Sequence, residues 1–206
     1  MIKKTFLMIF IGLLSVMSSC DNNPVAHERF TNYFPLQIGN EWTFQFPVWT
    51  PSSGDTLTSL DYKIIKKKEV NGKEYYGFNR RMPFFPHNRI IEGLDTIFVR
   101  QNESGDIMLL ADSTEYLYFV FTLEEDTLVR SEIKEVRYFY ATESINETVD
   151  TPIGKFQNCY IIFNYFPQIK GTEHRIYFAP GYGPVKIYYP EMSVTYQLVG
   201  INIQNK

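Results

Sequence analysis

Few residues of this 206-residue chain have the types and spacing that catalysis or metal binding requires. The three histidines, His27, His87 and His174, lie far apart in the sequence. None has a second histidine, a cysteine or a carboxylate at a metal-ligand spacing such as His-x-x-x-His. The sequence therefore predicts no metal site and no cofactor, and we expect each histidine to be solvated or structural.

The remaining candidates for catalysis are a cysteine and an acidic run. Cys159 begins an apolar segment, which favours a small core residue, because a catalytic cysteine needs a base and partial exposure. Glu124-Glu125-Asp126 lies in an expected turn, where solvation is its expected role. Carboxylate pairs of the glycosidase type are set by the fold and not by sequence spacing. We therefore expect a protein that is not an enzyme, and keep an extracytoplasmic hydrolase as the third hypothesis.

Cys20 is the residue for which the sequence predicts a definite modification. In residues 1–19, Lys3-Lys4 precede an apolar run, and small residues come just before the cysteine, as in an export signal. The site resembles the lipobox of bacterial lipoproteins, in which the thiol is acylated, for example with palmitate, and becomes the new N-terminus. An anchor of several acyl chains holds a protein firmly on a membrane. The alternative is an ordinary cleaved signal in which Cys20 has no role.

Residues 20–32 are expected to be the lipidated cysteine and a polar tether, and residues 33–206 one domain. The 15 Tyr and 17 Phe of the chain favour pleated sheet, and no stretch has a convincing helical apolar stripe, although residues 131–135 could form one helical turn. Asn71-Gly72 between two strand-like runs predicts a hairpin, whereas residues 47–54 are expected to be a loop. The fold class is therefore all-β, with a highly curved antiparallel sheet or an open β-barrel of about ten strands.

Residues 151–189 are predicted to form three strands joined by two Gly/Pro connections. The glycine-rich connection does not predict a phosphate site, because another strand follows it and not a helix. The stretch resembles a family of bacterial exported proteins and lipoproteins of unknown function, and the resemblance implies a curved sheet like that of lipoprotein carrier and sorting domains, with no catalytic residues. It is carried by Pro152-x-Gly154-x-Phe156-x-x-Cys159, Ala179-Pro180-Gly181-x-Gly183-x-Val185 and, near the front, Phe34-Pro35-Leu36 with Gly39-Asn40-x-Trp42-Thr43.

Residues 78–89 form a proline-broken segment that is both aromatic and cationic. Such a segment cannot be a regular strand, so it can present side chains at a rim or surface. Arg81, Phe84 and Phe85, together with Trp49, are our candidates for a ligand or partner surface. The plainer alternative is a loop folded over the mouth of the barrel.

Three hypotheses follow from the sequence. The first is a binding or carrier lipoprotein for a hydrophobic or amphiphilic ligand, and the second is an interaction module of the cell envelope with a filled core. The hydrolase is the third. The expected location is a lipid-anchored one, on the outer membrane of a Gram-negative bacterium, and short Asp-Ser/Thr-apolar triplets resemble the O-glycosylation acceptors of Bacteroidetes. A net charge of −3 argues against a nucleic-acid partner.

Overall fold

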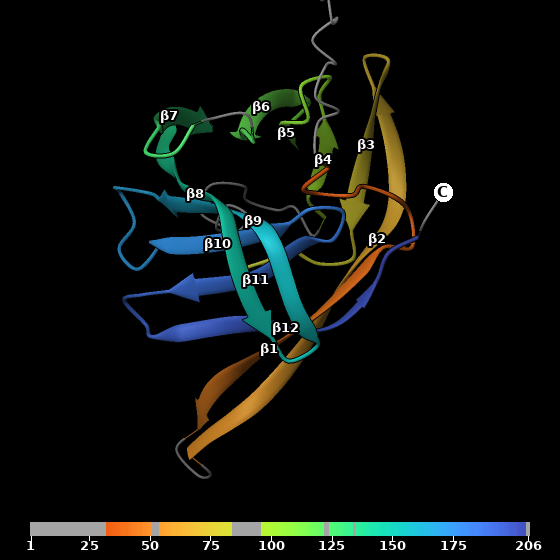
Figure 1. Ribbon diagram of the computed structural model, residues 1–206. Coiled ribbons are helices and arrows are strands. Elements are labelled where there is room, and N and C mark those ends of the chain that lie inside the picture. The colour runs from red at the N-terminus through yellow and green to blue at the C-terminus, as the bar shows by residue number, and fades with distance from the viewer. Residues whose placement is uncertain (1–31, 51–53, 84–95, 122–123, 134, 205–206) are drawn as a thin grey trace, which may run out of the picture.

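The computed structural model describes residues 32–50, 54–83, 96–121, 124–133 and 135–204 (Figure 1). The predicted signal, Cys20 and the tether up to residue 31 lie outside these ranges. No helix among the described residues is long and apolar enough to cross a membrane. The described residues form twelve strands: β1 (Glu41–Thr50), β2 (Gly54–Val70), β3 (Lys73–Phe78), β4 (Phe98–Gln101), β5 (Ile107–Ala111), β6 (Thr114–Phe119), β7 (Leu128–Ile133), β8 (Val136–Thr151), β9 (Gly154–Tyr165), β10 (His174–Ala179), β11 (Gly183–Tyr189) and β12 (Val194–Asn202).

All twelve strands belong to one antiparallel sheet that curves into a nearly closed barrel. Their order is β6-β5-β4-β3-β2-β1-β12-β11-β10-β9-β8-β7, so strands that follow one another in the chain pair, except β6 and β7, and β1 pairs with β12. The predicted all-β fold is confirmed. Figure 1 shows that β1 and β2 run on beyond the body of the barrel as a long hairpin.

The barrel has one seam, between β6 and β7, which side chains cross. The Ser131 hydroxyl donates a hydrogen bond to the carbonyl oxygen of Leu117 at 3.3 Å. Tyr138 of β8 reaches the same carbonyl and that of Tyr118, the latter at 3.0 Å. Two backbone carbonyl groups of β6 thus have side-chain partners where β6 and β7 form no strand ladder.

One end of the barrel, which we call the closed end, is filled by aromatic rings. The ring centroid of Phe34 lies 5.9 Å from those of Trp42 and Phe78 and 6.0 Å from that of Phe178, and all four side chains are fully buried. Because such rings gain free energy both from burial and from ring–ring contact, they hold this end shut.

The glycine-rich connection between β10 and β11 fits against this aromatic group. The indole N–H of Trp42 donates to the carbonyl oxygen of Tyr182 at 2.6 Å. Gly183 has a φ of +88°, and a Cβ there would lie 3.0 Å from the Trp42 ring. The connection is therefore a turn shaped by packing, as the sequence predicts.

Two local predictions are wrong. Residues 131–133 are strand β7, not a helical turn. Most of residues 47–54 belongs to β1 and β2, where Pro47 pairs with Leu57. Beyond Gln45, β1 pairs only with β2, so the missing N–H of a proline costs no ladder bond on the open side.

Candidate functional site

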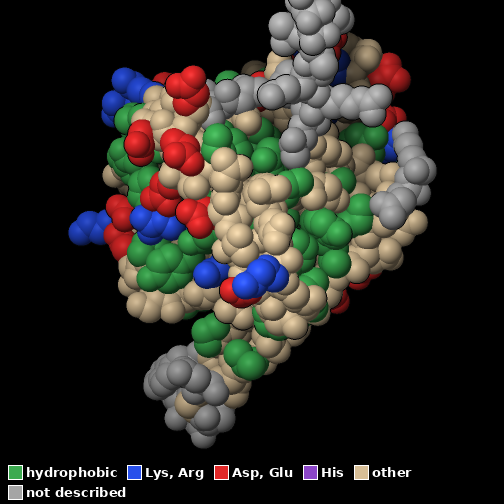
Figure 2. All heavy atoms as spheres, in the orientation of Figure 1, with side chains coloured by type: hydrophobic (Ala, Val, Ile, Leu, Met, Phe, Trp, Pro, Cys, Tyr) green, Lys and Arg blue, Asp and Glu red, His purple; other side chains and the backbone are tan. Residues whose placement is uncertain are grey.

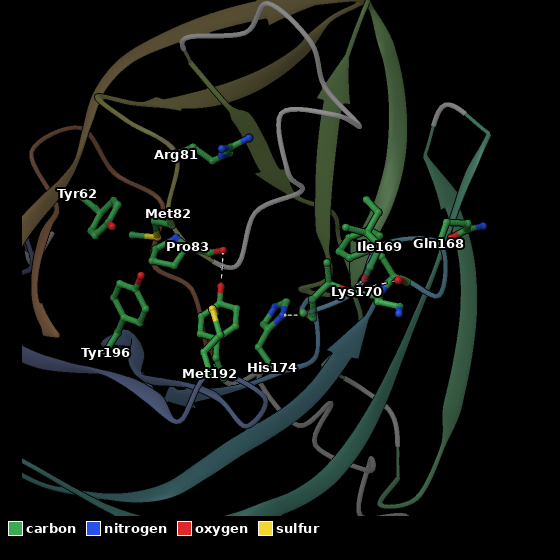
Figure 3. A pocket seen from close by; sticks show the side chains of 14 residues that line it. Tyr62, Arg81, Met82, Pro83, Gln168, Ile169, Lys170, His174, Met192 and Tyr196 are labelled. Atoms are coloured by element: carbon green, nitrogen blue, oxygen red, sulfur yellow. Dashed lines mark hydrogen bonds between the residues drawn. The ribbon is translucent and has the colours of Figure 1, made fainter. Parts of the chain in front are cut away.

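The other end of the barrel holds a cavity of about 770 Å³, which we call the mouth cavity. Its volume lies within the range of about 300–1,000 Å³ that is typical of small-molecule sites. Figure 3 shows side chains converging on it from separate parts of the chain. The lining consists of Tyr62, Arg81, Met82, Pro83, Phe166, Gln168, Ile169, Lys170, Gly171, Thr172, His174, Tyr189, Met192 and Tyr196.

Side-chain alternation along the strands explains this lining. In β10 the inward positions run from His174 at the mouth to Phe178 at the closed end, and both residues are buried. In β11 they run from Tyr189 at the mouth to Val185. Because every second residue of a strand faces inward, β10 and β11 each place one inward residue at the mouth and another at the closed end.

Tyrosines form one side of the cavity. In Figure 3 the hydroxyls of Tyr62 and Tyr196 point into it, close to Met82. The Tyr189 hydroxyl donates to the carbonyl oxygen of Pro83 at 2.7 Å, which ties residues 81–83 to β11. Burial raises the pKa of all three tyrosines, so they are neutral hydroxyl groups at ordinary pH.

The loop from Phe166 to Thr172 forms the opposite side. The Thr172 hydroxyl donates to the carbonyl oxygen of Ile169 at 2.8 Å and accepts from the N–H of Phe166 at 3.0 Å. The N–H of Ile169 also donates to the carbonyl oxygen of Phe166 at 2.9 Å. These bonds make the loop a defined wall, with Ile169 as its apolar side chain.

His174 is the buried polar residue of the cavity lining and is only 3% exposed. Its Nδ1 lies 2.6 Å from the carbonyl oxygen of Thr172, and its ring lies 5.1 Å from that of Tyr189. Burial lowers the pKa of His174 to about 4, so the ring is neutral at ordinary pH.

The sequence candidates for a ligand surface divide into two groups. Arg81 lies on the cavity wall, half-buried, and burial lowers the pKa of its guanidinium. Phe84 and Phe85 lie outside the described residues, and so does the side chain of Trp49. His27 and His87 are outside them too. His174, which sequence analysis left among the solvated or structural histidines, is the one histidine described, and it lies in the cavity lining.

The other candidates for chemistry have structural roles. Cys159 is buried, and burial raises the pKa of its thiol to about 11, so it is the predicted core residue. Glu125 accepts hydrogen bonds from the backbone N–H of Ile145 at 3.1 Å and the hydroxyl of Ser144 at 3.3 Å. Within the described part of the chain, no three His, Cys, Asp or Glu residues are grouped so that they could hold a metal ion.

Charged side chains of both signs lie on the outer surface. On the face that Figure 2 shows, acidic side chains gather at the upper left with basic ones beside them. Two lysines of β2 lie over one aromatic ring: the Nζ atoms of Lys66 and Lys68 are 5.3 and 4.2 Å from the Phe98 ring centroid. They lie outside the cavity lining.

The fold and the cavity together define a nearly closed antiparallel β-barrel with an open mouth. Two solved structures are similar to this chain. One is a Bacteroides fragilis protein assigned as exported, with a YmcC-like fold; it is 16% identical, the match covers 84% of this chain and 100% of that one, and the TM-score is 0.47. The other, from Parabacteroides distasonis and assigned as a lipoprotein, is 14% identical over 84% and 99% of the two chains, with a TM-score of 0.39. No protein-family model matches the sequence, and a search of curated proteins finds no match.

Proposed function

We propose that this protein is a lipid-anchored binding protein of the bacterial cell envelope that holds a hydrophobic or amphiphilic ligand in its mouth cavity. The mouth cavity is the observation that carries the proposal. Its volume suits a small amphiphile, and Met82, Pro83, Phe166, Ile169 and Met192 give it apolar surface. Sites for such ligands are mostly apolar with a few placed polar groups.

The anchor and the location rest on the sequence alone. Acylated Cys20 is the expected link to the membrane, and residues 21–32 are the expected tether. The outer membrane of a Gram-negative bacterium, in the Bacteroidetes, is the proposed location. The ligand would then be a molecule that an envelope protein can take up from a membrane or from the space beside it.

We propose binding and not catalysis. The cavity lining contains no carboxylate among the residues that the structure describes. Burial moves the pKa of His174 to about 4 and raises the pKa of Tyr62 and Tyr189, so these groups are held away from neutrality. General acid–base catalysis works best with a pKa near the operating pH.

A second candidate function is an interaction module, and one surface feature favours it. A groove of about 580 Å³ lies beside the turns of β8–β9 and β10–β11. Ile153 and Tyr182 line it and are 41% and 47% exposed. Exposed apolar side chains in a groove are typical of partner surfaces. A partner protein would bind there without using the mouth cavity.

A cavity-filling substitution separates the two functions. Met192 lines the mouth cavity and is 54% exposed, so Met192→Trp can place a larger side chain there without disturbing the core. We expect the affinity for an environment-sensitive apolar dye to fall about tenfold or more, a loss of about 1.4 kcal/mol. Fluorescence titration measures it.

Leu57→Trp is the matched control, because Leu57 is 68% exposed on β2 and lies outside the cavity lining. It should leave the dye affinity unchanged. Equal affinities for both variants and the unaltered protein would mean that the dye does not enter the mouth cavity.

A further inference from the structure

The hydrogen bond that His174 makes fixes which of its nitrogens can accept another. A carbonyl oxygen cannot donate, so the contact of 2.6 Å to Thr172 requires the proton to be on Nδ1 (Figure 3). In the neutral ring Nε2 then carries a lone pair and no proton. Nε2 is buried and has no hydrogen-bond partner among the described residues.

An unpaired buried acceptor of this kind is costly. Leaving a buried polar atom unsatisfied costs about 1–3 kcal/mol, and such atoms are rare in native proteins. His174 also pairs across the sheet with Asn164, which in turn pairs with Tyr140, so three buried polar residues form a row across β10, β9 and β8. The interior at the mouth is thus built with polar groups where apolar ones would be more stable.

The phenol groups in the cavity differ from His174 in the hydrogen bonds that they can make. Neither Tyr62 nor Tyr196 has a hydroxyl hydrogen bond to another described residue, and both hydroxyls point into the cavity (Figure 3). A phenol both donates and accepts, so these two can bond to almost any polar head group. Nε2 of His174 can only accept. Selection for a donor therefore depends on His174.

We propose that the cavity selects an amphiphile with a neutral hydrogen-bond donor on its head, a hydroxyl or an amide N–H, which donates to Nε2 of His174. This rests on the proposed function, since it names the ligand class of the same cavity. The head lies beside His174 and Tyr189, and the phenols of Tyr62 and Tyr196 bond to its remaining polar atoms.

A carboxylate head fits this arrangement less well. It has no proton to donate, and it would lose hydration beside the lone pair of His174. Arg81 and Lys170 bring positive charge to the lining, but Lys170 is exposed to solvent and Arg81 already takes part in an interaction with another group. The experiment must therefore distinguish ligands with a charged head group from ligands with a neutral donor head group.

Three probes with the same alkyl length test the selection: dodecanol, methyl laurate and laurate. Each is titrated against the full chain carrying Cys20→Ser, with displacement of an apolar dye as the readout. Dodecanol can donate, whereas methyl laurate and laurate can only accept. We expect dodecanol to bind about tenfold more tightly than either, the effect of one hydrogen bond to an otherwise unpaired acceptor.

Two variants test which side-chain atoms cause the preference for dodecanol. His174→Phe keeps a ring beside Tyr189 and removes the acceptor, so dodecanol should lose its advantage over methyl laurate. Tyr196→Phe should weaken dodecanol and methyl laurate alike, because the phenol can donate to both. Equal losses for both probes in His174→Phe would overturn the role of Nε2, and tighter binding of laurate would overturn the neutral head.

If His174→Phe does not fold, nitrogen-15 NMR of the His174 ring in the protein without this substitution provides a second test. The Nε2 resonance should move upfield with dodecanol and stay in place with methyl laurate. The same shift with both probes would mean that a water, not the ligand, bonds to Nε2. If no probe displaces the dye, the proposed function itself fails; if all three displace it equally, only the head-group selection fails.

Discussion

The closed end and the mouth of this barrel are both lined by aromatic side chains, but the rings at the two ends differ in kind. At the closed end the ring of Phe34 packs against those of Trp42 and Phe178, and all three side chains are fully buried. At the mouth, Tyr189, Tyr196 and His174 are among the rings that line a cavity of about 770 Å³, together with Tyr62 and Phe166. The phenylalanine rings have no polar atom and the indole N–H of Trp42 is paired with the carbonyl oxygen of Tyr182, whereas phenols and imidazole that line a cavity need partners. The kind of ring therefore distinguishes the end that we interpret as structural from the end that we propose as a binding site.

The largest expected effect is at the closed end. Phe34→Ala removes a ring that contacts three other aromatic rings, and such a truncation costs about 3–5 kcal/mol in unfolding free energy. Urea denaturation measures the loss. Leu57→Ala, at a position that is 68% exposed, is the control and should change stability by less than about 0.5 kcal/mol. A loss below about 1 kcal/mol in Phe34→Ala would mean that this ring does not hold the closed end together.

The next largest effect is expected at the mouth, where His174 makes the stability of the folded protein depend on pH. The pKa of His174 is lowered in the folded state, from its ordinary 6.5 to about 4. Between these values the unfolded chain binds a proton that the folded chain does not, so stability is complete above pH 6.5 and is lost as the pH falls towards 4. The loss is at most about 3 kcal/mol.

Unfolding measured from pH 7 to pH 4 tests this for the unsubstituted protein and His174→Phe. Stability of the variant should depend less steeply on pH over this window. Parallel curves for the two proteins would show that His174 is not held neutral by burial.

A smaller effect is expected at the seam, which belongs to neither end. Tyr138→Phe removes the hydroxyl that bonds to the carbonyl oxygens of Leu117 and Tyr118. We expect a loss of about 1–2 kcal/mol in unfolding free energy. Tyr188→Phe, on the outer face of β11, is the control and should be nearly neutral. Hydrogen exchange should quicken at β6 and β7 before it quickens elsewhere; uniform exchange would contradict a weakened seam.

Much of the fold could be predicted from local chemistry. Asn71 and Gly72 have φ angles of +52° and +72°, as the hairpin turn that they predict requires. Alternation in β9 and the turn before Gly183 were likewise readable from residue types. The continuation of β1 through residues 47–50 was not, because Pro47 suggests a loop unless one knows that this part of β1 has a free edge.

The candidate site could be predicted only in part. Arg81 lies in the proline-broken segment that the sequence predicts to be at a rim or surface, and it lines the mouth cavity. His174 carried no such signal, because its neighbours Asn164 and Tyr189 come from other strands and meet it only through sheet register. The cavity is formed by side chains from separate parts of the chain that meet inside the curved sheet, so no short run of residues predicts it.

The measurement that tests the central claim most directly is mass spectrometry of molecules bound to the purified protein. The Cys20→Ser chain, which carries no anchor lipid, is prepared without detergent from a Gram-negative host and extracted into organic solvent. We predict one hydrophobic or amphiphilic molecule per chain, and much less in Met192→Trp. An extract without such a molecule, from protein with a well-folded β-sheet spectrum, would contradict the account of the mouth cavity as a ligand site.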